Sequence, residues 1–162
     1  MILYYISQKQ RYLLEKFDDS ATCGNTIINS LFVAQYEEYK RKSEAGEKWE
    51  TDSRIIKFLK GELRHGKRCH QVNTIYLPMN QSNEHWFLVA VRLNEWRIDV
   101  FDSLYIPRRK EGRLNVVRPL ASMLPQELED VQFFDARSKL VKYKNLEFNI
   151  VYNRNVCPQQ SG

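Results

Sequence analysis

The order of patterns along this 162-residue chain predicts an α+β domain: helices first, then a meander of strands, then one more helix and strand. Two observations support this prediction. Apolar residues recur at helical spacing near the start of the chain, whereas from Val72 onward the apolar segments are short and rich in branched and aromatic residues. We expect one domain over residues 1–162, mainly helical over 1–70 and containing a sheet over 71–162.

Two helices are predicted in the first part. The first spans residues 25–41, where apolar residues recur every three or four positions and Asn25 can cap the N-terminus. A polar break over 43–50 follows. The second helix begins at Asp52 or Ser53 and ends near Gly61.

The second part contains the predicted strands. Residues 74–77, 86–93 and 97–101 are rich in residues that favour strands, and a polar loop over 80–84 separates the first two. Residues 116–124 have a helical pattern that Pro125 is expected to stop. A last apolar segment over 148–152 is predicted to be another strand.

The strands 86–93 and 97–101 form a predicted antiparallel hairpin that turns at Asn94-Glu95. A two-residue loop and a four-residue loop give the same register, which makes His85 and Asp102 diagonal neighbours on one face. Diagonal residues lie roughly 7–8 Å apart, within reach of a histidine and a carboxylate. Asp99 falls on the other face, so it is the poorer partner for His85.

A carboxylate beside a histidine has a defined chemical use. We expect Asp102 to accept the Nδ1 proton of His85 and thereby to leave Nε2 facing a nucleophile. The alternative is a histidine at a strand edge with an incidental surface contact. The hairpin alone leaves both open.

Four short pieces of the sequence occur in this order: Pro78-Met79-Asn80, His85-Trp86, Asp102-Ser103 and Pro158-Gln159-Gln160. With these pieces, the sequence over about residues 75–162 resembles the ubiquitin-like-protease (SUMO protease) family of papain-like cysteine proteases, in which they occur in the same order. In this family the Pro-Gln-Gln precedes Asp-Cys-Gly, whose cysteine is the nucleophile. The resemblance implies a papain-like fold with an antiparallel or mixed sheet flanked by helices, and a peptidase that removes or matures SUMO or ubiquitin-like modifiers (protein desumoylation).

The same resemblance implies the site residues. His85 is the expected general base, Asp102 its orienting carboxylate, and Gln160 (or Gln159) the donor to the oxyanion. Trp86 is expected to wall the channel for a Gly-Gly tail, with core packing as the alternative. Many relatives also carry a Trp-Leu pair before the first helix, which this sequence lacks.

The nucleophile is absent from the sequence and is expected after Gly162. We therefore expect the fold to be incomplete at its C-terminus and the 162-residue chain to be inactive. In the family, the helix that follows the cysteine covers much of the sheet. The face that carries Phe87, Val89 and Val100 should accordingly form an apolar groove with Gln160 at its rim.

The cysteines present do not replace that nucleophile. Cys23, Cys69 and Cys157 are odd in number and widely spaced, which argues against disulfides and fits a reducing compartment. Neither Cys23 nor Cys157 has surroundings of the catalytic kind. His65, Cys69 and His70 have loosely metal-like spacing but no fourth ligand, so we expect a solvated basic loop, no metal and no cofactor.

The remaining observations concern partners. No apolar stretch is long enough to cross a bilayer and no signal peptide is recognisable, so we expect an intracellular protein, in the nucleus among other compartments, without membrane contact. The expected partners are a SUMO-type modifier and its conjugates. A non-catalytic remnant that binds such a modifier is the alternative function. Nucleic-acid binding, suggested by the net charge of +5, ranks third because no recognised module is present.

Overall fold

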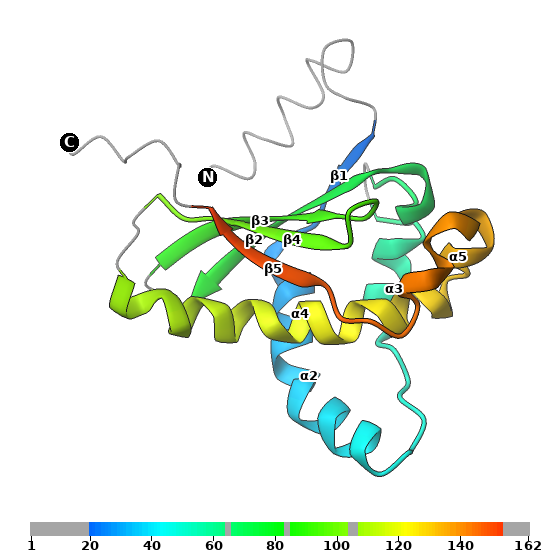
Figure 1. The fold of residues 1–162 in the computed structure, drawn as a ribbon, viewed down its shortest axis with the longest axis horizontal. Helices are drawn as coiled ribbons and strands as arrows, with labels where there is room; N and C mark the ends of the chain where they lie inside the picture. The colour runs from blue at the N-terminus through cyan, green and yellow to red at the C-terminus, as the bar shows by residue number, and fades with distance from the viewer. Residues whose placement is uncertain (1–19, 64–65, 83–84, 104–106, 154–162) are drawn as a thin grey trace.

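A mixed five-stranded sheet forms the centre of the fold (Figure 1). A computed structural model describes residues 20–63, 66–82, 85–103 and 107–153. The strands lie side by side in chain order: β1 (Ala21–Cys23), β2 (Thr74–Gln81), β3 (His85–Arg92), β4 (Arg97–Phe101) and β5 (Asn149–Asn153). β2, β3 and β4 are antiparallel, whereas β1 runs parallel to β2 and β5 parallel to β4.

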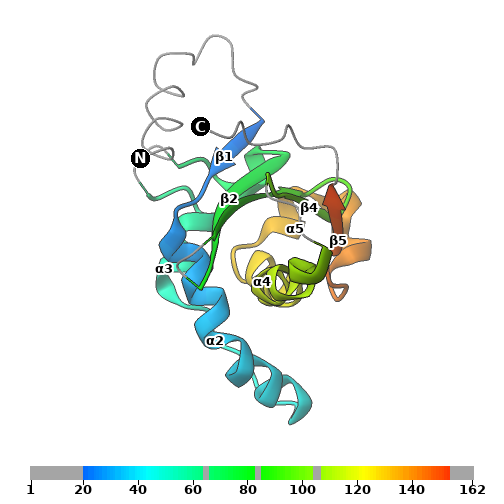
Figure 2. The same ribbon diagram turned by 90° about the vertical axis from the view of Figure 1, so that its left-hand side faces the viewer.

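The helices are α2 (Thr26–Glu44), α3 (Ser53–Leu59), α4 (Lys110–Asp130) and α5 (Phe133–Ala136). Short 3-10 segments lie at Cys69–Gln71, Pro107–Arg109 and Ser138–Tyr143. Figure 2 shows α4 under the curved sheet, with α2 and α3 beside it. The predicted α+β class is confirmed, but the predicted order is incomplete, because the strand β1 precedes the first helix.

Both predicted N-terminal helices form; Asn25 caps the first as expected, and Asp52, one of the two predicted starts, caps the second. Asn25 Oδ1 accepts the Ile28 backbone N–H at 3.1 Å at the start of α2. Asp52 Oδ1 accepts the Arg54 N–H at 2.8 Å at the start of α3. Gly61 follows α3 with a φ of +70°, a conformation that suits glycine.

The predicted hairpin register is confirmed. Arg92 pairs with Arg97 across a four-residue turn, and Val89 pairs with Val100. The first strand of the meander is longer than predicted, because β2 continues past Leu77 to Gln81 and pairs with the start of β3. The predicted loop over 80–84 is therefore shorter than expected.

The prediction that Pro125 stops the third helix is wrong, since α4 continues to Asp130. A proline inside a helix leaves the carbonyl four residues earlier without its usual donor. Here that carbonyl belongs to Ala121, and it accepts the backbone N–H of Phe148 at 3.1 Å, just before β5. A tertiary hydrogen bond thus replaces the missing helical one.

The predicted apolar groove on the sheet is also wrong. Phe87 is 6% exposed, and Val89 and Val100 are fully buried. α4 supplies the cover, because its buried residues Val117 and Leu120 belong to the same core cluster. The sequence pattern underestimated this cover because it predicted fewer than half of the residues of α4.

Candidate active site

His85 and Asp102 lie within hydrogen-bonding distance, as the hairpin register predicts. His85 opens β3 and Asp102 follows β4, so both lie at the same end of the hairpin. His85 Nε2 is 2.8 Å from Asp102 Oδ1. The Asp102 side chain is completely buried, whereas that of His85 is 17% exposed. The pair therefore has a buried carboxylate and an imidazole that solvent reaches.

The orientation of the imidazole corrects the prediction. Nε2 contacts the carboxylate, whereas Nδ1 was expected to do so. Nε2 lies farther from the backbone than Nδ1, so it is the nitrogen that spans a diagonal separation of roughly 7–8 Å. With the Nε2 proton donated to Asp102, Nδ1 is the nitrogen with a lone pair for a nucleophile's proton. The Phe87 ring lies nearly parallel to the imidazole, at 6.3 Å between centroids.

Within the described ranges, Tyr152 and Arg113 also contact Asp102, and sequence reasoning missed both. Tyr152 in β5 donates its hydroxyl to Asp102 Oδ2 at 2.5 Å, and Arg113 Nε in α4 lies 2.5 Å from the same oxygen. Arg113 is itself fully buried. One signal was present: Arg113, Val117, Leu120 and Leu124 recur at helical spacing, so a charged residue stands in the apolar stripe of a helix.

Asp99 is engaged elsewhere, in agreement with the predicted register. It accepts from Arg92 Nε at 3.2 Å and pairs with Arg97 Nε at 2.9 Å on the other face of the sheet. Asp102 is therefore the acid that contacts His85.

Trp86 lies next to His85 and faces away from the core. It pairs with Asn80 in the register between β2 and β3. Trp86 is 53% exposed. This exposure contradicts the core-packing alternative. An exposed indole beside the histidine is available for contact with another molecule.

The described cysteines lie away from this pair. Cys23 in β1 stands opposite Tyr76, which stands opposite Ala90, five positions along β3 from His85. At about 3.3 Å per residue, that is roughly 17 Å along the strand. Cys69 precedes the other end of β2, and burial raises the pKa of its thiol to about 11. Neither is placed to give its proton to His85.

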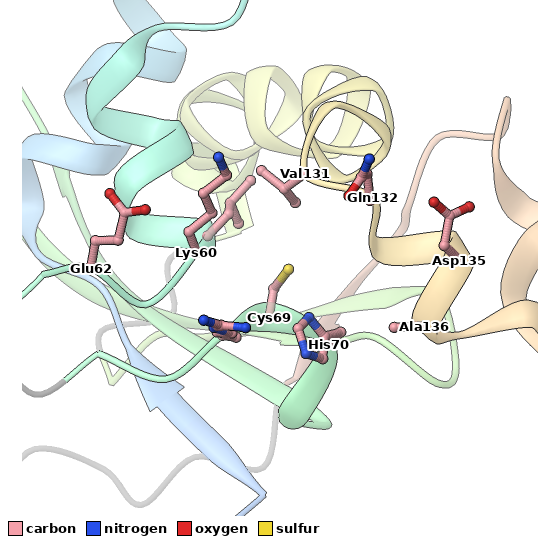
Figure 3. A pocket seen from close by; sticks show the side chains of 10 residues that line it. Lys60, Glu62, Cys69, His70, Val131, Gln132, Asp135 and Ala136 are labelled. Atoms are coloured by element: carbon pink, nitrogen blue, oxygen red, sulfur yellow. The ribbon is translucent and has the colours of Figure 1, made fainter.

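A cavity of about 520 Å³ lies around Cys69 (Figure 3). Its lining includes the polar residues Lys60, Glu62, His70 and Asp135. No cluster of three or more potential metal ligands occurs among the described residues. Cys69 is 1% exposed, so the expectation of a solvated loop is wrong at this residue.

Some residues of the sequence analysis lie outside the described residues, among them His65 and the candidates Cys157, Gln159 and Gln160. In the described part of the chain, no helix is long and apolar enough to cross a membrane.

Comparisons with known proteins concern the family and the fold of this chain. No curated protein gives a significant match. A solved structure of the C-terminal Ulp1 protease domain in complex with Smt3, the yeast ortholog of SUMO, matches with a TM-score of 0.52 at 17% identity. That match covers 91% of this chain and 52% of the other. The chain thus spans about half of the solved structure, and the similarity confirms the fold.

A second solved structure, the SUMO protease Ulp1 with its catalytic cysteine oxidized to a sulfenic acid, matches with a TM-score of 0.44 at 18% identity. It also covers 91% of this chain and 52% of the other. The family model described as "Ulp1 protease family, C-terminal catalytic domain" matches residues 5–162, nearly the whole sequence. The chain therefore belongs to the Ulp1 protease family and carries part of its cysteine-peptidase domain.

Proposed function

We propose that this chain supplies the general base of a thiol peptidase that cleaves after the C-terminal glycine of a SUMO-type modifier. The observation that carries the proposal is the 2.8 Å contact between His85 and the buried Asp102, beside the exposed Trp86. Membership of the Ulp1 protease family supplies the reaction class. The proposal treats residues 1–162 as one domain.

In the proposed reaction, His85 takes the proton of a cysteine thiol, and the resulting thiolate attacks the carbonyl of the scissile bond. Asp102 holds the imidazole in the Nε2–H tautomer and stabilises the imidazolium. The proton then passes to the leaving amine, and water hydrolyses the thioester. Gln160 (or Gln159) is proposed to donate to the oxyanion and Trp86 to contact the Gly-Gly tail.

The nucleophile is proposed to follow Gly162, because neither described cysteine lies near His85. The proposed location is intracellular, with the nucleus as one of the compartments. The proposed partners are a SUMO-type modifier and its conjugates. The sequence has three cysteines, and this odd number fits a reducing compartment.

The test compares the 162-residue chain with a longer protein, extended past Gly162 by any coding sequence that follows in the gene. The substrate is a SUMO-type precursor whose Gly-Gly is followed by a reporter. We expect the longer protein to cleave it and the 162-residue chain not to. His85→Ala should lower kcat/KM about 10²–10⁴-fold, whereas His70→Ala, outside the proposed site, should leave it within about twofold.

Two results would overturn the proposal. The first is a longer protein whose cleavage is insensitive to His85→Ala. The second is thiol-dependent cleavage by the 162-residue chain itself. A longer protein without a cysteine after Gly162 that still binds the modifier would instead support the non-catalytic binding function.

A further inference from the structure

The Asp102 carboxylate stands where three elements meet: the end of β4, the first turns of α4 and the end of β5. Its Oδ1 contacts His85 Nε2, and its Oδ2 contacts both Arg113 Nε and the Tyr152 hydroxyl. The carboxylate side chain is 0% exposed and that of Arg113 is 1% exposed. A buried carboxylate is stable only when it is paired and hydrogen-bonded, so these contacts are required wherever Asp102 is ionised.

We propose that Arg113 and Tyr152 are positioning residues of the active site: they hold Oδ2 of Asp102, so that Oδ1 stays directed at His85 Nε2. This inference rests on the proposed function, because it gives the two residues a role only through the pair of His85 and Asp102. It extends that function from two side chains on a hairpin to four side chains on four elements.

The fold fixes where both positioning residues lie. Arg113 shares the sheet-facing stripe of α4 with Val117 and Leu120, which are fully buried, so packing of the helix sets its position. Tyr152 stands opposite Val100 in the parallel pairing of β4 and β5, two residues before Asp102. Each residue therefore approaches Oδ2 from a different element, and rotation of the carboxylate would break both contacts.

Arginine suits this position better than lysine. Its guanidinium remains charged at ordinary pH and is planar and rigid, so the ion pair between its Nε and Asp102 Oδ2 has a fixed direction. The ammonium group of a lysine carries the same charge but has no rigid planar group. Arg113→Lys should consequently keep the counter-charge but lose part of the orientation.

A purely structural role for these residues is the competing explanation. Arg113 and Tyr152 would then tie α4 and β5 to the sheet, and their loss would lower stability without changing the contact between His85 and Asp102 in folded molecules. The two explanations differ in a spectroscopic property of His85, which the 162-residue chain can report without catalysing a reaction.

The experiment is ¹H–¹⁵N NMR of the histidine rings in the 162-residue chain. The chain has three histidines, and His85→Ala assigns the ring of interest. In the wild type we expect a downfield Nε2–H signal that exchanges slowly with solvent. Tyr152→Phe, which removes one hydroxyl, should speed this exchange roughly tenfold, and Arg113→Met should abolish the signal. Arg113→Lys should give an intermediate rate.

Two controls keep the result interpretable. Arg118 lies on the same helix as Arg113, and its side chain is 44% exposed. The variant Arg118→Met should leave the His85 signal unchanged. The indole N–H of Trp96, which donates to Leu146 O, reports whether each variant is folded. If Arg113→Met does not fold, Tyr152→Phe and Arg113→Lys still carry the test.

The outcomes separate this inference from the proposed function. Folded Tyr152→Phe and Arg113→Lys variants with a wild-type His85 signal would overturn the positioning role but leave the catalytic pair in place. A wild-type chain without a protected Nε2–H signal would instead overturn the pair on which the proposed function rests.

Discussion

Replacing Glu127 by glutamine should stabilise the protein at neutral and alkaline pH. Glu127 lies in α4, is 0% exposed, and neither of its oxygens accepts a hydrogen bond from any residue that the structure describes. Burial raises the pKa of its carboxyl well above the usual value, and the charges of Asp130 and Asp52 raise it further. The folded state therefore binds this proton more tightly than the unfolded chain does.

The sign of the pH dependence follows from that difference. Below the ordinary value of 4.5, the carboxyl is protonated in both states and has no effect on the balance. As pH rises above 4.5, the unfolded chain releases the proton while the folded protein must retain it or bury a charge. The free energy of unfolding thus falls from that pH up to the raised pKa of the folded state.

Glu127→Gln removes the ionisation but keeps the size and the unsatisfied polar atoms of a protonated carboxyl. The gain at pH 8 comes from the ionisation alone and should be about 1.4 kcal/mol for each pH unit between the ordinary value of 4.5 and the raised pKa of the folded state. It should shrink toward zero near pH 4.5, the ordinary value for the carboxyl. For a domain of this size, each kcal/mol raises Tm by about 2–4 °C.

Urea unfolding followed by tryptophan fluorescence at several pH values between about 4.5 and 8 measures this difference. The control is Glu129→Gln on the same helix, where the side chain is 37% exposed and pairs with Lys144. That change should alter stability by less than about 1 kcal/mol at any of these pH values. A gain at Glu127 that is independent of pH, or a loss at pH 8, would refute the reasoning.

Two further predictions concern stability. Trp96→Ala should lower the free energy of unfolding by about 3–5 kcal/mol. The buried ring stacks on Phe148, with 4.0 Å between ring centroids, and its Nε1–H donates to Leu146 O. A loss of less than about 1 kcal/mol in chemical denaturation would contradict this prediction. Asp52→Ala should cost about 1 kcal/mol at pH 7 as a lost helix cap. The pKa of Asp52 is lowered mainly by Arg54, so this loss should shrink as pH falls below 3.8, and a loss undiminished at pH 2 would refute it.

Local patterns predicted the parts of this protein that depend on neighbours in the chain. Asn25 caps its helix as expected, and the second helix begins where predicted, at Asp52, because a cap contacts backbone groups only two or three residues away. The hairpin register, and with it the contact between His85 and Asp102, followed from the alternation of side chains on two adjacent strands. The pair of His85 and Asp102 was therefore predictable from a single hairpin.

Contacts between distant segments decided the rest. Pro125 stays inside α4 because Phe148, far along the chain, donates to the carbonyl that the proline leaves free. Arg113 and Tyr152 reach Asp102 only once α4 lies on the sheet and β5 pairs with β4. Which nitrogen of His85 meets the carboxylate depended on the direction in which the ring extends across the sheet. Sequence periodicity specifies which face of an element is apolar, but the partner of that face is settled only by packing in three dimensions.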